Sequence, residues 1–121
     1  MNTPTATERV RARYETALWL AQRASAVVLA LCVVVHLATI FYAVRHGLSA
    51  EAILGRVRGA PGWAAFYGVF VAAAAVHAGV GLRAVLAEWV GWRGRGTDRA
   101  LALLAFALAA FGGRAVAAMF G

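Results

Sequence analysis

Three long apolar runs, separated by short stretches rich in arginine and glycine, dominate the hydrophobic pattern of the chain. Uncharged residues extend from Ala24 to Val44, from Trp63 to Leu82 and from Ala100 to Gly113. A helix needs about 20 apolar residues to cross a bilayer, and the first two runs reach that length. The third is shorter, and Arg114 beyond it must extend toward the headgroups or find a partner. The pattern predicts three transmembrane helices.

Polar residues, breakers and tryptophans mark the ends of these helices. We expect helices over about 17–44, 62–89 and 99–120, which form one transmembrane domain over residues 17–121. Residues 1–16 are polar and charged, and we expect an N-terminal tail or a short surface helix there. The tryptophans fall at helix ends in the pattern of an aromatic belt: Trp19, Trp63, Trp89 and Trp92.

The connections between the helices carry cap signals. Ser49 is placed to cap a short interfacial helix in the first connection, and Pro61 precedes the second helix at a position that proline tolerates. Thr97 or Asp98 is expected to cap the third helix after the glycine-rich link 91–96.

Composition supports an all-α integral membrane protein. The chain is 63% hydrophobic and 14% charged, whereas soluble domains are about half apolar and about a quarter charged. All 12 basic residues are arginines, and the net charge is +7. Because the arginines flank the apolar runs, membrane orientation explains them better than nucleic-acid binding does.

The arginines are more numerous on the side of the N-terminus. This distribution favours a cytoplasmic N-terminus and an external C-terminus. One side carries Arg9, Arg11, Arg13, Arg93, Arg95 and Arg99, and the other carries Arg45, Arg56 and Arg58.

Several functional classes are disfavoured. Three helices are few for an independent transporter or channel, no acidic residue lies within an apolar run, and no nucleophile–base constellation is visible, so no catalytic residue is predicted. Cys32 is the single cysteine, which argues against a disulfide or a covalently attached haem. We therefore expect a subunit that forms part of a larger hetero-oligomeric helical bundle.

His77 lies in the middle of the second helix, among alanines and glycines. An ionisable residue at membrane depth is a functional candidate by default, and imidazole is a common metal ligand. Ala73, Ala74, Gly79 and Gly81 share or flank the His77 face of the helix, and such small residues would let a flat b-type haem approach. The alternative is a histidine bonded to a neighbouring helix.

His36 is a second candidate on the first helix, where Cys32 and Thr39 share its face. It lies about 20 Å along the helix from Arg23, and His77 lies about 17 Å from Glu88 at the same membrane face. Equal depths would allow one haem between the two helices. Unequal depths would give each histidine a separate haem, completed by a partner chain. His36 could also be a polar packing residue.

Three further polar residues lie near the predicted cytoplasmic face. Arg83 follows His77 by about 9 Å and could pair with a haem propionate or extend to the interface. Arg23 and Ser25 could hydrogen-bond a quinone carbonyl, or serve as a charge anchor and a packing residue.

Two segments carry a resemblance to a known family. Residues 22–26, Gln-Arg-Ala-Ser-Ala, resemble the His-Arg-x-Ser-Gly opening of the cytochrome b subunit of succinate dehydrogenase. Residues 77–83, His-Ala-Gly-Val-Gly-Leu-Arg, resemble its His-x-x-x-Gly-hydrophobic-Arg segment. Gln22, Ala26 and Ala84 depart from the family's patterns. His36 resembles the first-helix histidine of dihaem members.

The resemblance implies a membrane anchor of succinate dehydrogenase or fumarate reductase that binds haem b and helps to form a quinone site. His77 and, with less support, His36 would bind haem iron, Arg83 would lie at the propionate side, and Arg23 and Ser25 would contact ubiquinone or menaquinone. Partners would be an iron–sulfur subunit, a flavoprotein subunit and a second small transmembrane anchor, in the bacterial inner membrane. Dicarboxylate oxidation would occur on another subunit.

Two alternatives stay open at this stage. The chain could be a haem-free anchor or interaction subunit, or a cytochrome b subunit of another dehydrogenase. The number of haems, the quinone type and the direction of the reaction also stay open.

Overall fold

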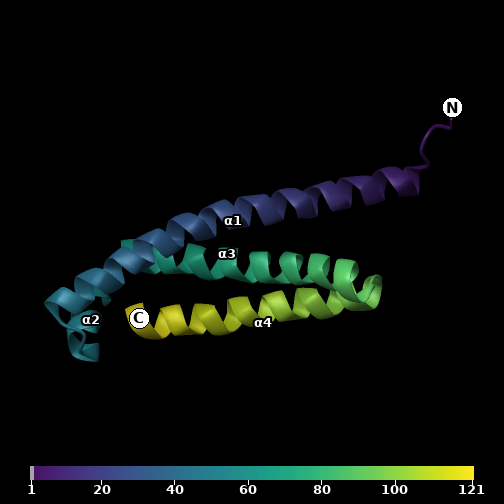
Figure 1. Cartoon of the computed structure of the whole chain (residues 1–121). Helices are drawn as coiled ribbons and strands as arrows, with labels where there is room; N and C mark the ends of the chain where they lie inside the picture. Colours follow the sequence, from purple (N-terminus) through teal and green to yellow (C-terminus); the bar gives the residue numbers. More distant parts are fainter. Residues whose placement is uncertain (1) are drawn as a thin grey trace.

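A computed structural model describes residues 2–121, and they form helices joined by short connections (Figure 1). In chain order these are α1 (Ala6–His46), α2 (Ala50–Val57), α3 (Pro61–Val85), the π-helical segment η1 (Leu86–Val90) and α4 (Arg95–Phe120). Three helical units, namely α1, α3 with η1, and α4, are long and apolar enough to cross a membrane. The predicted all-α architecture with three membrane-crossing helices is confirmed.

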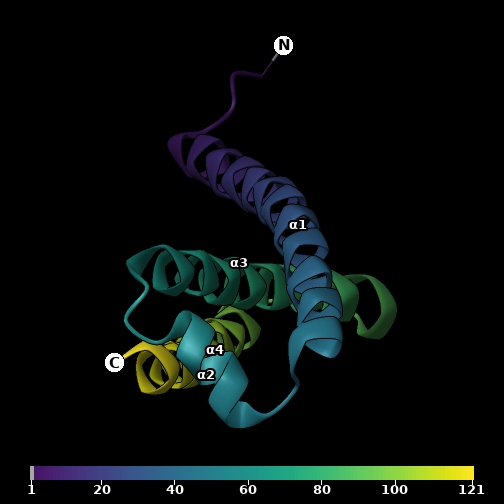
Figure 2. The ribbon, with the colours of Figure 1, turned by 90° about the vertical axis from the view of Figure 1, so that its left-hand side faces the viewer.

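The central helix of the arrangement is α3, which packs against both α1 and α4 (Figures 1 and 2). It runs antiparallel to both, so the N-terminus and C-terminus lie at opposite ends of the bundle (Figure 1). The short helix α2 lies at the C-terminal end and contacts α4. The N-terminal part of α1 extends beyond the ends of its neighbours (Figure 1).

The first helix begins at Ala6, earlier than the expected residue 17. Thr5 and Glu8 form a capping box: the Glu8 amide donates to the Thr5 hydroxyl at 3.2 Å, and the Thr5 amide donates to the Glu8 carboxylate at 2.6 Å. This motif satisfies two backbone donors and starts a helix. Residues 6–16 therefore belong to α1 and form neither a tail nor a separate surface helix.

The continuous first helix is longer than a membrane is thick. Its 41 residues extend about 60 Å at about 1.5 Å per residue, whereas the hydrocarbon core measures about 30 Å. Roughly half of α1 therefore lies outside the hydrocarbon, which places its N-terminal turns among headgroups and beyond.

The connections test the predicted caps. Ser49 does cap α2, because its hydroxyl accepts a hydrogen bond from the Ala52 amide at 3.1 Å. Pro61 occupies the first turn of α3. The predicted cap at Thr97 or Asp98 is wrong. Instead α4 starts at Arg95, after Gly94 with φ 125°, and no side chain caps it. Since glycine tolerates positive φ, the chain turns before Thr97 is reached.

Small residues bring α3 and α4 into close contact. A Cβ atom added at Gly79 would lie 3.0 Å from the Ala105 Cβ, and one added at Gly112 would lie 2.5 Å from a Val71 methyl group. Small residues at helix interfaces allow close backbone approach in membranes, where burial of apolar surface gives little driving force. The sequence predicts that Gly79 lies open for the approach of a haem. This prediction is wrong, because Gly79 packs against Ala105 of α4.

Few side chains of the described residues are buried. The buried apolar residues are Cys32, Ala75 and Leu101, and the one buried polar residue is Ser25. Large apolar side chains are exposed along every long helix, including Leu31, Val69 and Phe106. A chain of this kind leaves most of its apolar surface to lipid and to other helices.

The close α3–α4 contact gives a direct test. We expect Gly112→Ala to lower the free energy of unfolding by about 1–3 kcal/mol, because overpacking forces the helices apart. Thermal unfolding of the purified complex in detergent measures the change. Gly113→Ala is the matched control, since a Cβ there meets nothing within 4 Å. Equal melting temperatures for both variants would contradict this account of the interface.

Candidate functional site

A stripe of side chains on α1 faces α3. Its members follow one another at spacings of three and four, which places them on one side of a helix. They are Gln22, Ser25, Leu29, Cys32 and His36. Ser25 and Cys32 are buried, and the others are partly buried. The polar members of this stripe therefore lie at the contact between two membrane-crossing helices.

Ser25 meets His77 across this contact. The Ser25 Oγ lies 3.3 Å from the His77 Nδ1 and also donates a hydrogen bond to the Gln22 carbonyl at 3.0 Å. No hydrogen bond involves the His77 Nε2 within residues 2–121. The ring is thus held at one nitrogen and has its other nitrogen available.

His36 meets Tyr67 in a similar way toward the other end of the bundle. Its Nδ1 lies 3.0 Å from the Tyr67 hydroxyl. The rings of Tyr67 and Phe70 both lie edge-on to the imidazole at 5.7 Å between centroids. Thr39 donates to the His36 carbonyl at 2.7 Å, and both side chains line the same groove, in agreement with the predicted shared face.

The two histidines lie at different depths. His77 is level with Ser25, and His36 is level with Tyr67. The stretch of α3 from Tyr67 to His77 measures about 15 Å at about 1.5 Å per residue. Two histidines that would hold one haem iron must bring their ring nitrogens within a few ångströms of each other. One haem iron therefore cannot take both histidines of the same chain.

A groove opens beside His36 between α1, α2 and α3, with Met119 of α4 also in its lining. It has a volume of about 780 Å³ and a mostly apolar lining, to which Thr39, Trp63, Tyr67 and Arg56 also contribute. Its volume is within the range of roughly 300–1,000 Å³ common for ligand pockets. Arg56 is already held at the end of this groove, because it donates to the Gly47 carbonyl at 2.6 Å.

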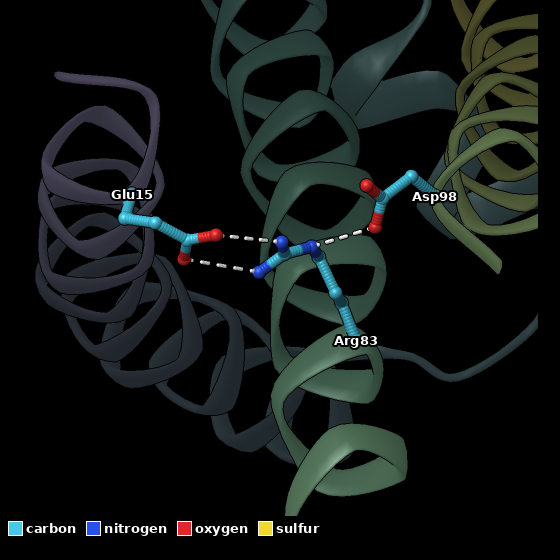
Figure 3. Close-up of polar contacts among 3 residues, drawn as sticks. All are labelled: Glu15, Arg83 and Asp98. Atoms are coloured by element: carbon cyan, nitrogen blue, oxygen red, sulfur yellow. Dashed lines mark hydrogen bonds and ion pairs between the residues drawn. The ribbon is translucent and has the colours of Figure 1, made fainter. Parts of the chain in front are cut away.

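Arg83 lies between two carboxylates (Figure 3). Its NH2 and NH1 groups donate to Glu15 at 2.9 and 3.3 Å, and its Nε donates to Asp98 at 2.8 Å. The guanidinium also lies 5.7 Å from the centre of the Tyr14 ring. One residue of α3 thereby joins α1 to α4. Three further arginines line the pocket around this cluster: Arg11, Arg93 and Arg95.

The structure does not bring Arg23 and Ser25 together. They are two positions apart and point to nearly opposite sides of α1. Ser25 is 6% exposed, whereas Arg23 lies on the outer surface with its guanidinium 5.4 Å from the centre of the Trp19 ring. A ligand that contacts both residues must reach around the helix.

Four residues of the site were missed in the sequence. Glu15 was assigned to the tail, although the capping-box pattern at residues 5–8 indicated that the helix begins before it. Asp98 was assigned as a cap, and Tyr67 gave no signal. Gln22 was noted only as a departure from the family pattern. Its Oε1 is buried without a hydrogen-bond partner among the described residues, and its Nε2 lies 3.0 Å from where a Cβ at Gly81 would be.

The donor set fits a haem better than a bare metal ion. Within residues 2–121, no three histidine, cysteine or acidic side chains gather as a metal site. Each of the two membrane histidines instead presents one ring nitrogen with no partner in the described chain. A b-type haem needs one such nitrogen on each side and can take the second from another chain.

These features define a transmembrane subunit that lacks a large core of its own. The model of a family described as succinate dehydrogenase/fumarate reductase transmembrane subunit matches residues 1–113, and the chain belongs to this family. No match was found among curated proteins or among solved structures.

The Arg83 cluster can be tested by a double-mutant cycle. We expect Glu15→Gln and Arg83→Gln to be coupled by about 0.5–1 kcal/mol, because both side chains are partly exposed and water screens the pair. Chemical or thermal unfolding of the purified complex measures the coupling. Glu51→Gln is the control, since Glu51 lies on α2 at the opposite end of the bundle. Additive effects of Glu15→Gln and Arg83→Gln would show that the ion pair does not join α1 to α3.

Proposed function

We propose that the chain is the haem b-binding membrane anchor of a succinate:quinone oxidoreductase. It passes electrons from an iron–sulfur subunit to ubiquinone or menaquinone, while dicarboxylate chemistry takes place on a flavoprotein subunit. The family membership supports the assembly. The observation that carries the proposal is the pair of membrane histidines, each held at Nδ1 with no partner at Nε2 within residues 2–121.

If both histidines bind iron, the difference in depth requires two haems per complex. His77 supplies one iron ligand near the N-terminal end of the bundle, and His36 supplies another beside the groove near α2. A partner chain supplies the opposite ligand of each. Haem b, when bound, undergoes one-electron oxidation and reduction at its iron. The chain contributes the nitrogen ligands, their orientation and an apolar surrounding that excludes water.

The propionate role of Arg83 has less support from the contacts. Three of its five N–H donors are used by Glu15 and Asp98, which leaves two for a further carboxylate. Glu15 and Asp98 would compete with a propionate for the guanidinium, although three further arginines line the same pocket and would attract it, namely Arg11, Arg93 and Arg95. In the proposed function, Arg83 can therefore bind a haem propionate only through its two remaining N–H donors.

The proposed quinone site lies on the turn of α1 that holds Gln22, Arg23 and Ser25. Arg23 points outward, and its guanidinium can donate to a quinone carbonyl. The buried Gln22 Oε1 can accept a hydrogen bond from a hydroxyl of the reduced quinone only if its side chain turns away from α3. Ser25 contributes only if its hydroxyl gives up a contact to Gln22 or His77.

The proposed partners and orientation agree with the distribution of apolar and charged residues on the surface. The exposed apolar faces fit lipid and a second small transmembrane subunit. The arginine-rich end with the N-terminus faces the cytoplasm of a bacterial cell, with the iron–sulfur subunit docked there. The N-terminal turns of α1, which extend beyond the membrane, lie on that same side.

Absorption spectra test the haem sites. We expect a b-type signal in the reduced-minus-oxidised spectrum of the complex purified through this chain, with two haems per complex. His77→Ala and His36→Ala should each remove about half of the haem. His46→Ala is the matched control, since this histidine is exposed beyond the membrane and contacts the Tyr42 carbonyl at 3.0 Å.

Three outcomes would contradict this proposal. Absence of a b-type signal in the wild type would leave a haem-free anchor. Loss of all haem in His77→Ala with no loss in His36→Ala would reduce the number to one and make His36 a packing residue. Co-purification with a different dehydrogenase would exclude succinate or fumarate as the substrate of the complex.

Steady-state kinetics test the quinone site. We expect Arg23→Gln to raise the KM for a soluble quinone roughly tenfold, because a hydrogen bond from a charged donor contributes about 1.5–3 kcal/mol. Electron transfer to an artificial acceptor that bypasses the quinone should be unchanged. Arg13→Gln, in the exposed N-terminal turns of the same helix, is the control. An unchanged KM in Arg23→Gln would remove this residue from the site.

A further inference from the structure

The Ser25 hydroxyl lies between a backbone carbonyl, which can only accept a hydrogen bond, and an imidazole nitrogen, which can donate or accept one. The Gln22 carbonyl oxygen is 3.0 Å from the Ser25 Oγ, and the His77 Nδ1 is 3.3 Å from it. Ser25 is 6% exposed and is the one buried polar side chain of the described residues. Water is therefore poorly placed to substitute for either partner.

The single hydroxyl proton of Ser25 decides how these contacts are made. A carbonyl oxygen only accepts, so the contact with Gln22 uses the serine proton. The Ser25 oxygen is then an acceptor toward His77, and the His77 Nδ1 must donate. For a neutral imidazole this is the one arrangement that satisfies both contacts. It leaves the His77 Nε2 unprotonated, with its lone pair directed away from Ser25.

We infer that Ser25 is a positioning residue that selects the iron-binding tautomer of His77. The inference rests on the proposed haem site. An imidazole binds iron through an unprotonated nitrogen, and a hydrogen bond from the other nitrogen fixes the ring and raises its basicity. The relay runs from His77 through Ser25 to the Gln22 backbone carbonyl. Because a backbone group ends this relay, it cannot turn away as a side chain could.

Packing around Gln22 holds the relay in place. A Cβ at Gly81 would lie 3.0 Å from the Gln22 Nε2, so α1 and α3 approach closely one turn after His77. The backbone carbonyl that orients Ser25 and the helix that carries His77 are thereby kept at a fixed distance. This gives Ser25 a role distinct from the quinone contact that the family resemblance implied.

His36 has no equivalent relay. Its Nδ1 meets the Tyr67 hydroxyl at 3.0 Å, and this hydroxyl has no second partner in the described part of the chain. Tyr67 can donate to Nδ1 or accept from it, and both tautomers are compatible with the contact. Each histidine thus meets a hydroxyl group of the neighbouring helix, but this group fixes the tautomer of His77 and not that of His36.

The test compares Ser25→Ala, Ser25→Thr and wild type as purified complexes. We expect Ser25→Ala to lose the His77-bound haem about 10–100-fold faster to an excess of a soluble haem-binding apoprotein, the loss typical of an orienting partner. The midpoint potential of that haem should become more positive, since a less basic imidazole stabilises ferric iron less. Ser25→Thr, which keeps a hydroxyl, should restore both properties.

Thr16→Ala is the matched control. It removes a hydroxyl that bonds a backbone carbonyl of the same helix, that of Ala12 at 2.9 Å, but does not contact His77. It should leave haem loss and potential at wild-type values. The His36-bound haem in Ser25→Ala serves as an internal reference, because general unfolding would release both.

The outcomes separate this inference from the proposed function. If wild type lacks haem, the proposed function fails and takes the inference with it. If wild type holds haem and Ser25→Ala changes only the KM for quinone, then Ser25 is a quinone contact and the inference alone fails. Equal haem loss from Ser25→Ala and Ser25→Thr would also overturn it.

Discussion

Two hydrogen bonds between side chains set the register of α1 on α3, and the depth of both histidines depends on them. Ser25 meets His77 toward one end of the contact, and His36 meets Tyr67 toward the other. Apolar burial cannot fix this register in a membrane, since lipid tails are as apolar as leucine. A slide of α1 by one turn would break both bonds and leave two imidazoles without partners in an apolar surrounding, which is costly.

The α3–α4 contact has a different physical basis. There the backbones approach through Gly79 and Gly112, and the fit is steric. Arg83 adds an electrostatic connection at the end of the bundle, where Glu15 and Asp98 bind the same guanidinium. The central helix is thus joined to α1 by polar contacts and to α4 by close packing, with one arginine shared between them.

Local sequence patterns predicted the number of helices, the cap at Ser49 and the two membrane histidines, because these depend on residues close together in the chain. Contacts between helices could not be predicted in this way, because nothing near Tyr67 in the sequence indicates that its hydroxyl lies level with His36. Residues 6–16 differ from the expectation for another reason: their charged, polar composition is typical of a tail, but the capping box at Thr5 starts a helix that continues into the apolar run. The cap of α4 was misplaced because Gly94 ends the turn first.

The thin core has a consequence for how much of the protein a cell can accumulate. With Cys32, Ala75 and Leu101 as the buried apolar side chains of the described residues, the chain gains little stability from its own fold. An unassembled copy therefore leaves broad apolar faces without neighbouring helices. In the proposed assembly its half-life would depend on the supply of partner chains and of haem, and degradation of excess copies would help to set the stoichiometry.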